Sequence, residues 1–395
     1  MTARAPLEEL VSITGGGTPN RARADYYNGS IPWVTPKDMK VWSIHRSQET
    51  ITELGLLESA SRLVPSGSVL IVIRSGILKH TLPVAIARRP VAINQDMKAL
   101  IPNPGLNPEY LARFIQARSL RVLQWVRATT ADNFPLDELK ALEVPVPSSN
   151  EQQRITTQLE MADRLRRMRH YALQMCDEFL PAAFLEMFGD PRQNPHGFPI
   201  ERLGMLLSHK PSLGTTTPCT TKGKNICIRV GEIGQEEIEY VSCGRVDLPQ
   251  KDLVRYSVAD GDILLARAIG SEDHLGKLSV VNGKHLVSPT VHDSHVMRIR
   301  TNKAVLLPIY LSSLLQTHSG RAIFMRQARR TAVQFNINSE QIGGLSFPLP
   351  SVLKQWEFST IAAKINHFRA TQLEALRQAD HLFQTLLHQA FSSHS

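Results

Sequence analysis

An internal repeat is the feature that most constrains how this chain can fold. Three pairs of segments match in the same order: Pro65–Ile71 with Ala259–Leu265 at an offset of 194, Pro108–Leu111 with Pro308–Leu311 at an offset of 200, and Val144–Pro147 with Phe347–Pro350 at an offset of 203. The first pair is a glycine turn before an apolar run, and the second opens a helix with proline in its first turn. Such self-similarity predicts one structural unit built twice.

Each copy ends in a long helix. The run from Asn150 to Asp190 has no glycine before Gly189, and its counterpart extends from about Leu353 to Phe391. Apolar residues recur at steps of three and four, which predicts one apolar face on each helix. The residues expected to pair the helices are Ile155, Leu159, Ala162, Met168, Met175 and Phe179 in the first, and Phe358, Ile361, Ile365, Phe368, Leu382 and Leu386 in the second.

These two faces predict an antiparallel, coiled-coil-like pair of helices with a globular segment at each end. The alternative is two unrelated helices, each docked on its own domain. The expected fold class is α+β with an internal pseudo-twofold repeat. The expected segments are residues 1–148 and 190–350 for the globular parts, and residues 149–189 and 351–395 for the helices.

Composition points to a folded protein with a basic surface on its globular segments. The net charge is +4 in residues 1–148, −1 in 149–189, +5 in 190–350 and +1 in 351–395. Positive charge on the two large segments suits surfaces that face phosphates, although a mildly basic protein without a nucleic-acid partner fits the charge equally well. No apolar run approaches the roughly 20 residues that span a bilayer, so no membrane association is expected.

The cysteines indicate a reducing compartment and no metal. Cys176, Cys219, Cys227 and Cys243 match no paired zinc-ligand spacing, and no secretory signal precedes the first segment. We therefore expect free thiols and a cytoplasmic location.

The order of these features closely resembles the specificity (S) subunit of type I restriction–modification systems. The matching pieces are Ile31–Met39, Ala92–Met97, Glu151–Ile155 after Val144–Pro147, Phe184–Asp190 and Leu386–Phe391. In the second copy, Leu353–Trp356 replaces the Glu-Gln-Gln-Arg pattern at the start of the helix. The pair His292-Asp293 stands at the expected place of Asn94-Gln95.

The resemblance implies two target recognition domains separated by conserved helices, each domain reading one half of a bipartite DNA target. It also implies a non-catalytic chain that assembles with two methyltransferase (M) subunits, and with restriction (R) subunits in the cutting complex. The resemblance places S-adenosylmethionine on the partner M subunit, so no cofactor is expected on this chain.

The residues themselves offer no catalytic constellation. An adenine methyltransferase needs a polar-Pro-Pro-aromatic loop, and the chain contains no Pro-Pro pair. The segment from Gly270 to Leu278 resembles a P-loop but differs from the motif at two points. The spacing between its glycines is wrong, and Leu278 stands where the motif needs a hydroxyl residue. His292 and His295 lie in a β-like stretch, which favours a packed or solvated pair over a metal site.

A protein that reads duplex DNA needs basic side chains for phosphates and Arg, Lys, Asn or Gln on loops for base edges. Candidates cluster around glycine turns in both segments, although an ordinary surface charge is the alternative for each one. They are Lys37, Arg74, Lys79, Asn94, Gln95, Lys222, Lys224, Arg229, Arg267, Lys277, Arg329 and Arg330.

The function predicted from sequence is bipartite DNA recognition, with the long helices acting as a ruler between two readers. Two other classes stay open. One is a helical scaffold that binds proteins and no DNA, and the other is a specificity module fused to a methyltransferase.

Overall fold

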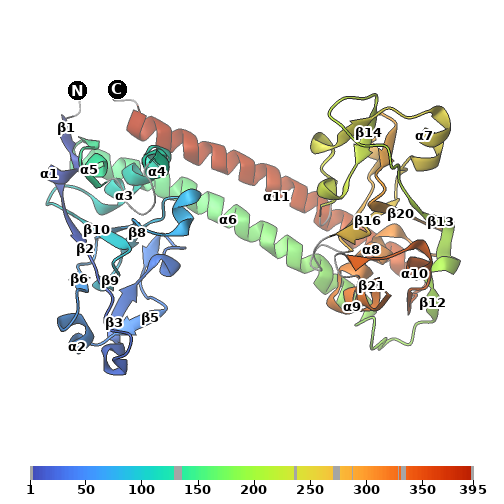
Figure 1. Cartoon of the computed structure of the whole chain (residues 1–395), viewed down its shortest axis with the longest axis horizontal. Helices are drawn as coiled ribbons and strands as arrows, with labels where there is room; N and C mark the ends of the chain where they lie inside the picture. The colour runs from blue at the N-terminus through green and yellow to red at the C-terminus, as the bar shows by residue number, and fades with distance from the viewer. Residues whose placement is uncertain are drawn as a thin grey trace. The chain divides into compact units, whose positions relative to one another are not determined.

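The computed structural model describes residues 3–128, 136–234, 238–269, 276–286, 288–327, 329–330 and 335–392. The chain folds into two compact units. Unit 1 comprises residues 1–170 and 374–395, and unit 2 comprises residues 171–373. Each unit therefore contains one globular part and a portion of both long helices, and both chain termini belong to unit 1 (Figure 1).

Unit 1 is built on two sheets and a short terminal pair. A five-stranded sheet has the order β2-β10-β7-β8-β4, and a four-stranded sheet has the order β5-β3-β9-β6. Strand β1 pairs with β11. The strands are β1 (Ala3–Pro6), β2 (Val11–Gly15), β3 (Tyr27–Val34), β4 (Ser43–Ile44), β5 (Glu49–Ile51), β6 (Arg62–Val64), β7 (Val69–Val72), β8 (Val84–Ala87), β9 (Val91–Ile93), β10 (Met97–Pro102) and β11 (Glu143–Val146).

Helix α3 (Pro108–Ala117) covers the buried face of the larger sheet in unit 1. Pro108 occupies its first turn, and the Asn107 side chain accepts a hydrogen bond from the Glu109 backbone N–H at 2.8 Å. Tyr110 and Phe114 are fully buried. The other helices are α1 (Leu7–Leu10), α2 (Glu53–Leu57), α4 (Ser119–Ala128) and α5 (Leu136–Lys140).

Unit 2 repeats this plan with four small sheets, in the orders β12-β23, β13-β20-β16-β18, β15-β14-β19 and β17-β22-β21. Its strands are β12 (Ile200–Arg202), β13 (Leu207–Leu213), β14 (Asn225–Ile228), β15 (Gly244–Val246), β16 (Ile263–Ala266), β17 (Ala268–Ile269), β18 (Leu278–Val280), β19 (Thr290–His292), β20 (Val296–Thr301), β21 (Arg329–Arg330), β22 (Phe335–Asn336) and β23 (Ser346–Pro348). Its helices are α7 (Gln250–Tyr256), α8 (Pro308–Gln316), α9 (His318–Gln327) and α10 (Ser339–Gly343).

The long helices are α6 (Ser149–Phe188) and α11 (Val352–Ser392), of 40 and 41 residues. In unit 1, Ile155, Leu159 and Ala162 of α6 share a core with Phe383 and Leu387 of α11. The opposite ends of the two helices meet in unit 2, where the Phe358 ring lies 5.5 Å from the ring of Phe184. The two helices are therefore antiparallel in each unit, and the predicted α+β class with paired long helices is confirmed (Figure 1).

The predicted pairing face is correct at its ends and wrong in the middle. Ile155, Leu159, Ala162 and Phe358 are buried, and Ile365 and Leu386 pack partly buried against the cores. Ile361 is half-buried. Five predicted pairing residues are instead exposed: Met168, Met175, Phe179, Phe368 and Leu382.

The predicted pairing residues are wrong after Ala162 because a different set of positions on α6 faces the partner helix there. After Ala162 the inward face continues with a step of four to Arg166, whereas the apolar pattern suggested a step of three. From there the buried positions lie one residue later than expected, as with Cys176 and Leu180. Arginine can occupy such a face because its stem is apolar, and the Arg166 guanidinium lies 4.5 Å from the Phe383 ring centroid.

Ion pairs between the two long helices occur at positions related by the 203-residue offset of the repeat. In unit 2, Arg369 Nε donates to Asp177 Oδ1 at 2.7 Å. The equivalent residues in unit 1 are Arg166 and Asp380, whose charged groups lie 3.8 Å apart. The repeat therefore extends from backbone topology to individual side-chain pairs.

Candidate nucleic-acid interface

In unit 1, the parallel pairing of β3 with β9 brings the turns that follow the two strands together. Val34 lies beside Ile93 in the register, so residues 35–38 and 94–96 leave the same end of the sheet. The first turn is closed by Asp38, whose Oδ2 accepts from the Thr35 backbone N–H at 2.9 Å. Lys37 is exposed at its tip. We call these two segments the turn pair of unit 1.

The glycine-rich segment after β2 crosses directly beneath this turn pair. The Gly17 N–H donates to the Ile93 carbonyl at 3.1 Å. A Cβ on Gly16 would lie only 1.8 Å from that same oxygen, so no other residue fits there. The crossing places the Thr18 hydroxyl in hydrogen-bond contact with the exposed Gln95 side chain.

Asp96 organises the polar residues at this surface. Its carboxylate accepts from Arg74 Nε at 2.7 Å and from Asn94 Nδ2 at 3.1 Å. Asn94 is only 6% exposed, and its Oδ1 accepts from the Asp96 backbone N–H. The prediction that Asn94 reads base edges is therefore wrong, because its amide is used to shape the turn. Arg74, Lys79 and Gln95 remain at the surface.

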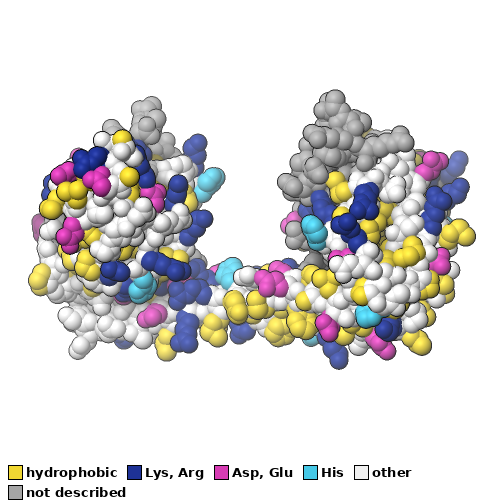
Figure 2. All heavy atoms as spheres, turned by 90° about the horizontal axis from the view of Figure 1, so that it is seen from below, with side chains coloured by type: hydrophobic (Ala, Val, Ile, Leu, Met, Phe, Trp, Pro, Cys, Tyr) yellow, Lys and Arg dark blue, Asp and Glu magenta, His cyan; other side chains and the backbone are white. Residues whose placement is uncertain are grey.

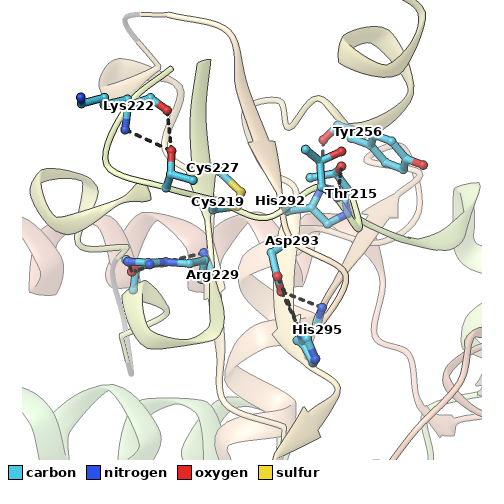
Figure 3. Close-up of a disulfide and its surroundings, with 12 residues drawn as sticks. Thr215, Cys219, Lys222, Cys227, Arg229, Tyr256, His292, Asp293 and His295 are labelled. Carbon is cyan, nitrogen blue, oxygen red and sulfur yellow. Dashed lines mark hydrogen bonds and ion pairs between the residues drawn. A yellow bond between two sulfur atoms is a disulfide. The ribbon is translucent and has the colours of Figure 1, made fainter. Parts of the chain in front are cut away.

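Unit 2 contains the same arrangement. Parallel pairing of β14 with β19 aligns Ile228 with His292 and brings together residues 229–232 and 293–295, the turn pair of unit 2. Buried Glu232 takes the place of Asp38, accepting from the Arg229 backbone N–H at 2.6 Å and from its guanidinium. The hydrogen bond raises the pKa of Arg229. The turns border a hollow of about 420 Å³ lined by Arg229, Asp293 and His295 (Figure 3).

The expected match of His292-Asp293 with Asn94-Gln95 is shifted by one residue. The Asp293 N–H donates to Ile228 as the Asn94 N–H donates to Val34, so Asp293 is the equivalent of Asn94. His292 is the equivalent of Ile93 and is fully buried. Its Nδ1 lies 2.9 Å from the Tyr256 carbonyl, and burial lowers the pKa of the imidazole to about 4. His292 is therefore a packed residue, as the sequence favoured.

A disulfide joins Cys219 and Cys227 beside this turn pair, which corrects the expectation of four free thiols (Figure 3). The other two cysteines lie outside this disulfide; Cys176 is buried and Cys243 is half-buried. Burial raises the pKa of the Cys243 thiol to about 11, so this group stays protonated at neutral pH. The disulfide closes the loop that carries Lys222 and Lys224, both exposed.

The remaining basic candidates of unit 2 follow strand β16. Arg267 donates from Nε to the Ser294 carbonyl at 3.0 Å, which ties it to the turn pair. Arg329 and Arg330 form β21, which is joined through β22 to β17, directly after Arg267. Lys277 is half-buried immediately before β18. The structure thus ties Arg267 directly to the turn pair of unit 2 and places Arg329 and Arg330 on a strand of the sheet that begins after Arg267.

Sequence reasoning missed the acidic residues that hold these turns. Asp38, Asp96 and Glu232 were not among the candidates. Asp96 and Glu232 each hold an arginine side chain, and Asp38 accepts from the backbone N–H groups of Thr35 and Gln48. The spacing Thr35–Asp38 is a capping-box signal that could have revealed the first of them. Figure 2 shows Lys and Arg side chains on both globular parts, and several hydrophobic side chains along the long helices.

Comparison with known proteins shows which family the chain resembles. Residues 4–170 match the family model of the type I restriction modification DNA specificity domain. The specificity subunit of the Escherichia coli EcoR124I/EcoR124II enzyme is 39% identical over 162 residues, which are 40% of this chain and 40% of that subunit. The first globular part thus matches the DNA specificity domain of type I restriction–modification systems, and over this part the chain resembles their specificity subunits.

Other specificity subunits match longer parts of this chain at lower identity. The MjaIX specificity subunit of Methanocaldococcus jannaschii is 29% identical over 54% of this chain, so the matched region spans about half the length of these relatives or less. The StySPI subunit of Salmonella potsdam is 22% identical over 98% of this chain and 88% of its own length.

Solved structures share the fold of the whole chain. The S subunit from M. genitalium aligns with a TM-score of 0.59 at 12% identity, covering 99% of this chain and 96% of that one. A chain from a structure on complex assembly and conformational transition of the type I R-M system also has a TM-score of 0.59, at 16% identity over 98% of this chain. Among the described residues, no helix is both long enough and apolar enough to cross a membrane.

Proposed function

We propose that this chain recognises a bipartite DNA sequence, with unit 1 reading one half and unit 2 the other. The observation that supports this most directly is that the turn pair is built twice. Both copies place exposed basic side chains, Lys37 in unit 1 and Arg229 in unit 2, on a turn closed by an acidic residue. Loops fixed on a rigid sheet suit base-edge readout, and lysines around them suit phosphate contacts.

The chemistry is proposed to lie on partner proteins. By analogy with its relatives, the chain would assemble with two methyltransferase subunits, which would bind S-adenosylmethionine, and with restriction subunits for cutting. The exposed apolar side chains on the long helices, among them Met168 in unit 1 and Phe179 in unit 2, are a suitable surface for such partners.

The helices are proposed to set the spacing between the half-sites. Removing one heptad from each, residues 169–175 of α6 and 372–378 of α11, keeps the heptad phase and shortens each by about 10 Å, or about three base pairs of DNA. The expected result of a binding-site selection with the assembled methyltransferase is a spacer shortened by about three base pairs with unchanged half-sites. An unchanged spacer would refute the ruler, and insertion of the same heptads should lengthen the spacer.

DNA binding itself is tested by a gel shift across salt concentrations. Phosphate contacts predict a steep decrease of affinity with rising salt, since each contact releases counterions. If the chain binds its partner proteins but shifts no DNA in the gel even at low salt, the result would support the helical scaffold instead.

A further inference from the structure

Each turn pair has an exposed arginine that is fixed by a carboxylate of the turns. In unit 1, Arg74 Nε donates to Asp96 Oδ1 at 2.7 Å. In unit 2, Arg229 donates to Glu232 Oε1 from Nε at 3.0 Å and from Nη2 at 2.5 Å. The two arginine side chains are still 51% and 44% exposed, so each lies at the surface with its orientation fixed from one side.

The backbone holds both arginines against the turn pairs. The N–H groups of Ile73 and Arg74 both donate to the Asp96 carbonyl, at 2.8 and 3.3 Å, so the chain that leaves β7 runs beside the second turn of unit 1. Arg229 is the first residue after β14 and opens the first turn of unit 2. Each arginine therefore starts from a fixed backbone position as well as having a fixed side-chain direction.

The carboxylates occupy one edge of each guanidinium and leave other donors unused. A guanidinium has five N–H groups in a planar fork. Among the described residues, the Arg74 guanidinium has no other hydrogen-bond partner, which leaves both of its Nη groups. The remaining donors of Arg229 are Nη1 and the second N–H of Nη2, whose contact with the Ser242 carbonyl is long at 3.4 Å. Both arginines therefore have a pair of parallel N–H groups available at the end of the fork.

This pair of N–H groups matches the edge of a guanine and suits a phosphate less well. Guanine presents two acceptors, O6 and N7, side by side in the major groove, and arginine can bond to both. A phosphate is an anion, and the carboxylate beside each arginine cancels part of the attraction. In unit 2 the hollow that Arg229 lines is also lined by acidic Asp293 (Figure 3). The carboxylates therefore favour a neutral pair of acceptors over a phosphate.

The two arginines are not related by the repeat. At the offset of 194, Arg229 aligns with Thr35, and Arg74 aligns with Ala268. Each copy thus has its arginine at a different place relative to the turn pair, although both arginines have an acidic partner. Two domains that read different half-sites need such a difference.

We propose that Arg74 and Arg229 each read one guanine in the major groove, one in each half-site. The inference rests on the proposed function, because a base can be read only if the turn pairs face duplex DNA. Since Asp96 and Glu232 already hold the guanidinium groups, little side-chain freedom is lost when the guanine binds.

The test is a selection of bound sequences from a randomised duplex library, using the full chain assembled with methyltransferase subunits. The wild-type chain should select at least one fixed G·C pair in each half-site. Arg74→Ala should leave one such position unspecified in one half-site, and Arg229→Ala should do so in the other half-site. At that position the ratio of affinities for guanine and for the other bases should fall by about tenfold or more, as loss of a bidentate contact predicts.

Two further variants make the selection decisive. If Arg229→Ala does not fold because buried Glu232 loses its partner, Arg229→Gln keeps an amide donor for that carboxylate. It should also lose the preference for guanine, since glutamine pairs with adenine. Arg23 is the matched control, because Asp25 holds its exposed side chain at 2.8 Å in the same way but before the start of β3, whereas the turn pair follows the end of that strand. Arg23→Ala should leave both half-sites unchanged.

The outcomes distinguish this inference from the proposed function. Suppose the wild-type chain selects a bipartite target, and an arginine variant keeps every G·C pair while it binds all sequences more weakly. That arginine then contacts phosphate, and the inference is wrong. A wild-type half-site without any G·C pair would also overturn it. If the wild-type chain selects no bipartite sequence, the proposed function itself fails, and this inference fails with it.

Discussion

Gln152 and Gln355 occupy one position of the repeat and make the same three hydrogen bonds. Gln152 Oε1 accepts from the Asn107 N–H at 2.8 Å, and its Nε2 donates to the carbonyls of Gly105 and Pro147. Gln355 Oε1 accepts from the Leu307 N–H at 2.8 Å, and its Nε2 donates to the carbonyls of Val305 and Pro350. Each glutamine thereby attaches the first turn of a long helix to its own globular part.

Replacing either glutamine by leucine should destabilise the unit that contains it. Gln152 and Gln355 are 1% and 0% exposed, so Gln152→Leu and Gln355→Leu leave buried backbone groups without partners. We expect a loss of about 1–3 kcal/mol for each, measured by urea unfolding. Gln158→Leu on the exposed face of α6 is the control and should change stability by less than about 0.5 kcal/mol. Equal effects of all three would contradict the attachment role.

The buried ion pair of unit 1 should be strongly coupled. Arg113 and Asp163 have side chains only 4% and 5% exposed, and desolvation lowers the pKa of Arg113 despite the neighbouring carboxylate. Arg113→Met leaves Asp163 with only Arg166 and Arg167, and should cost about 3 kcal/mol. In a double-mutant cycle, Asp163→Leu in the Arg113→Met background should cost much less than Asp163→Leu alone. Additive effects would show that the two residues act separately.

Acid should destabilise unit 2 through His292. The folded pKa of about 4 lies below the ordinary value of 6.5, so the unfolded chain takes up the proton first as the pH falls. This contribution to stability is complete above pH 6.5 and is lost between pH 6.5 and about 4, by at most about 3 kcal/mol. His292→Ile, which introduces the residue of unit 1, should flatten this part of the profile of unfolding free energy against pH. An unchanged slope would contradict the assignment.

The exposed lysines beside the turn pairs should contact phosphates. Lys37→Ala in unit 1 and Lys222→Ala in unit 2 should each weaken DNA binding at all sequences and reduce the slope of log K against log salt by about 1. The selected target sequence should not change. Lys364→Ala, exposed on α11, is the matched control and should leave the slope unaltered. A changed target sequence in either variant would instead assign that lysine to base readout.

Much of the architecture could be predicted because the repeat and the helices produce periodic patterns in the sequence. The repeat predicted that unit 2 copies unit 1, and the helix α6 begins at Ser149, where the turn signals end. The phase of the pairing face could not be predicted beyond Ala162, since Leu165 and Arg166 are both able to face the partner helix and only packing decides between them. In the structure the Arg166 guanidinium packs against the ring of Phe383 on the partner helix.

The candidate site was harder to predict because surface polar residues have no periodicity. Nothing in the sequence distinguishes Asn94, which is buried in a turn, from exposed Gln95 next to it. The disulfide between Cys219 and Cys227 depends on a loop returning to its own start, which spacing alone does not reveal. The basic candidates stay predictions, and the acidic residues Asp96 and Glu232, which hold some of these side chains, became visible only in three dimensions.

The central claim is that each globular part reads one half of a bipartite target. Replacing residues 1–148 by the corresponding segment of another specificity subunit, and mapping the methylated bases in a host that also carries the methyltransferase subunit, tests it most directly. The account predicts that one half-site changes while the other half-site and the spacer stay the same. A change in both half-sites would contradict it.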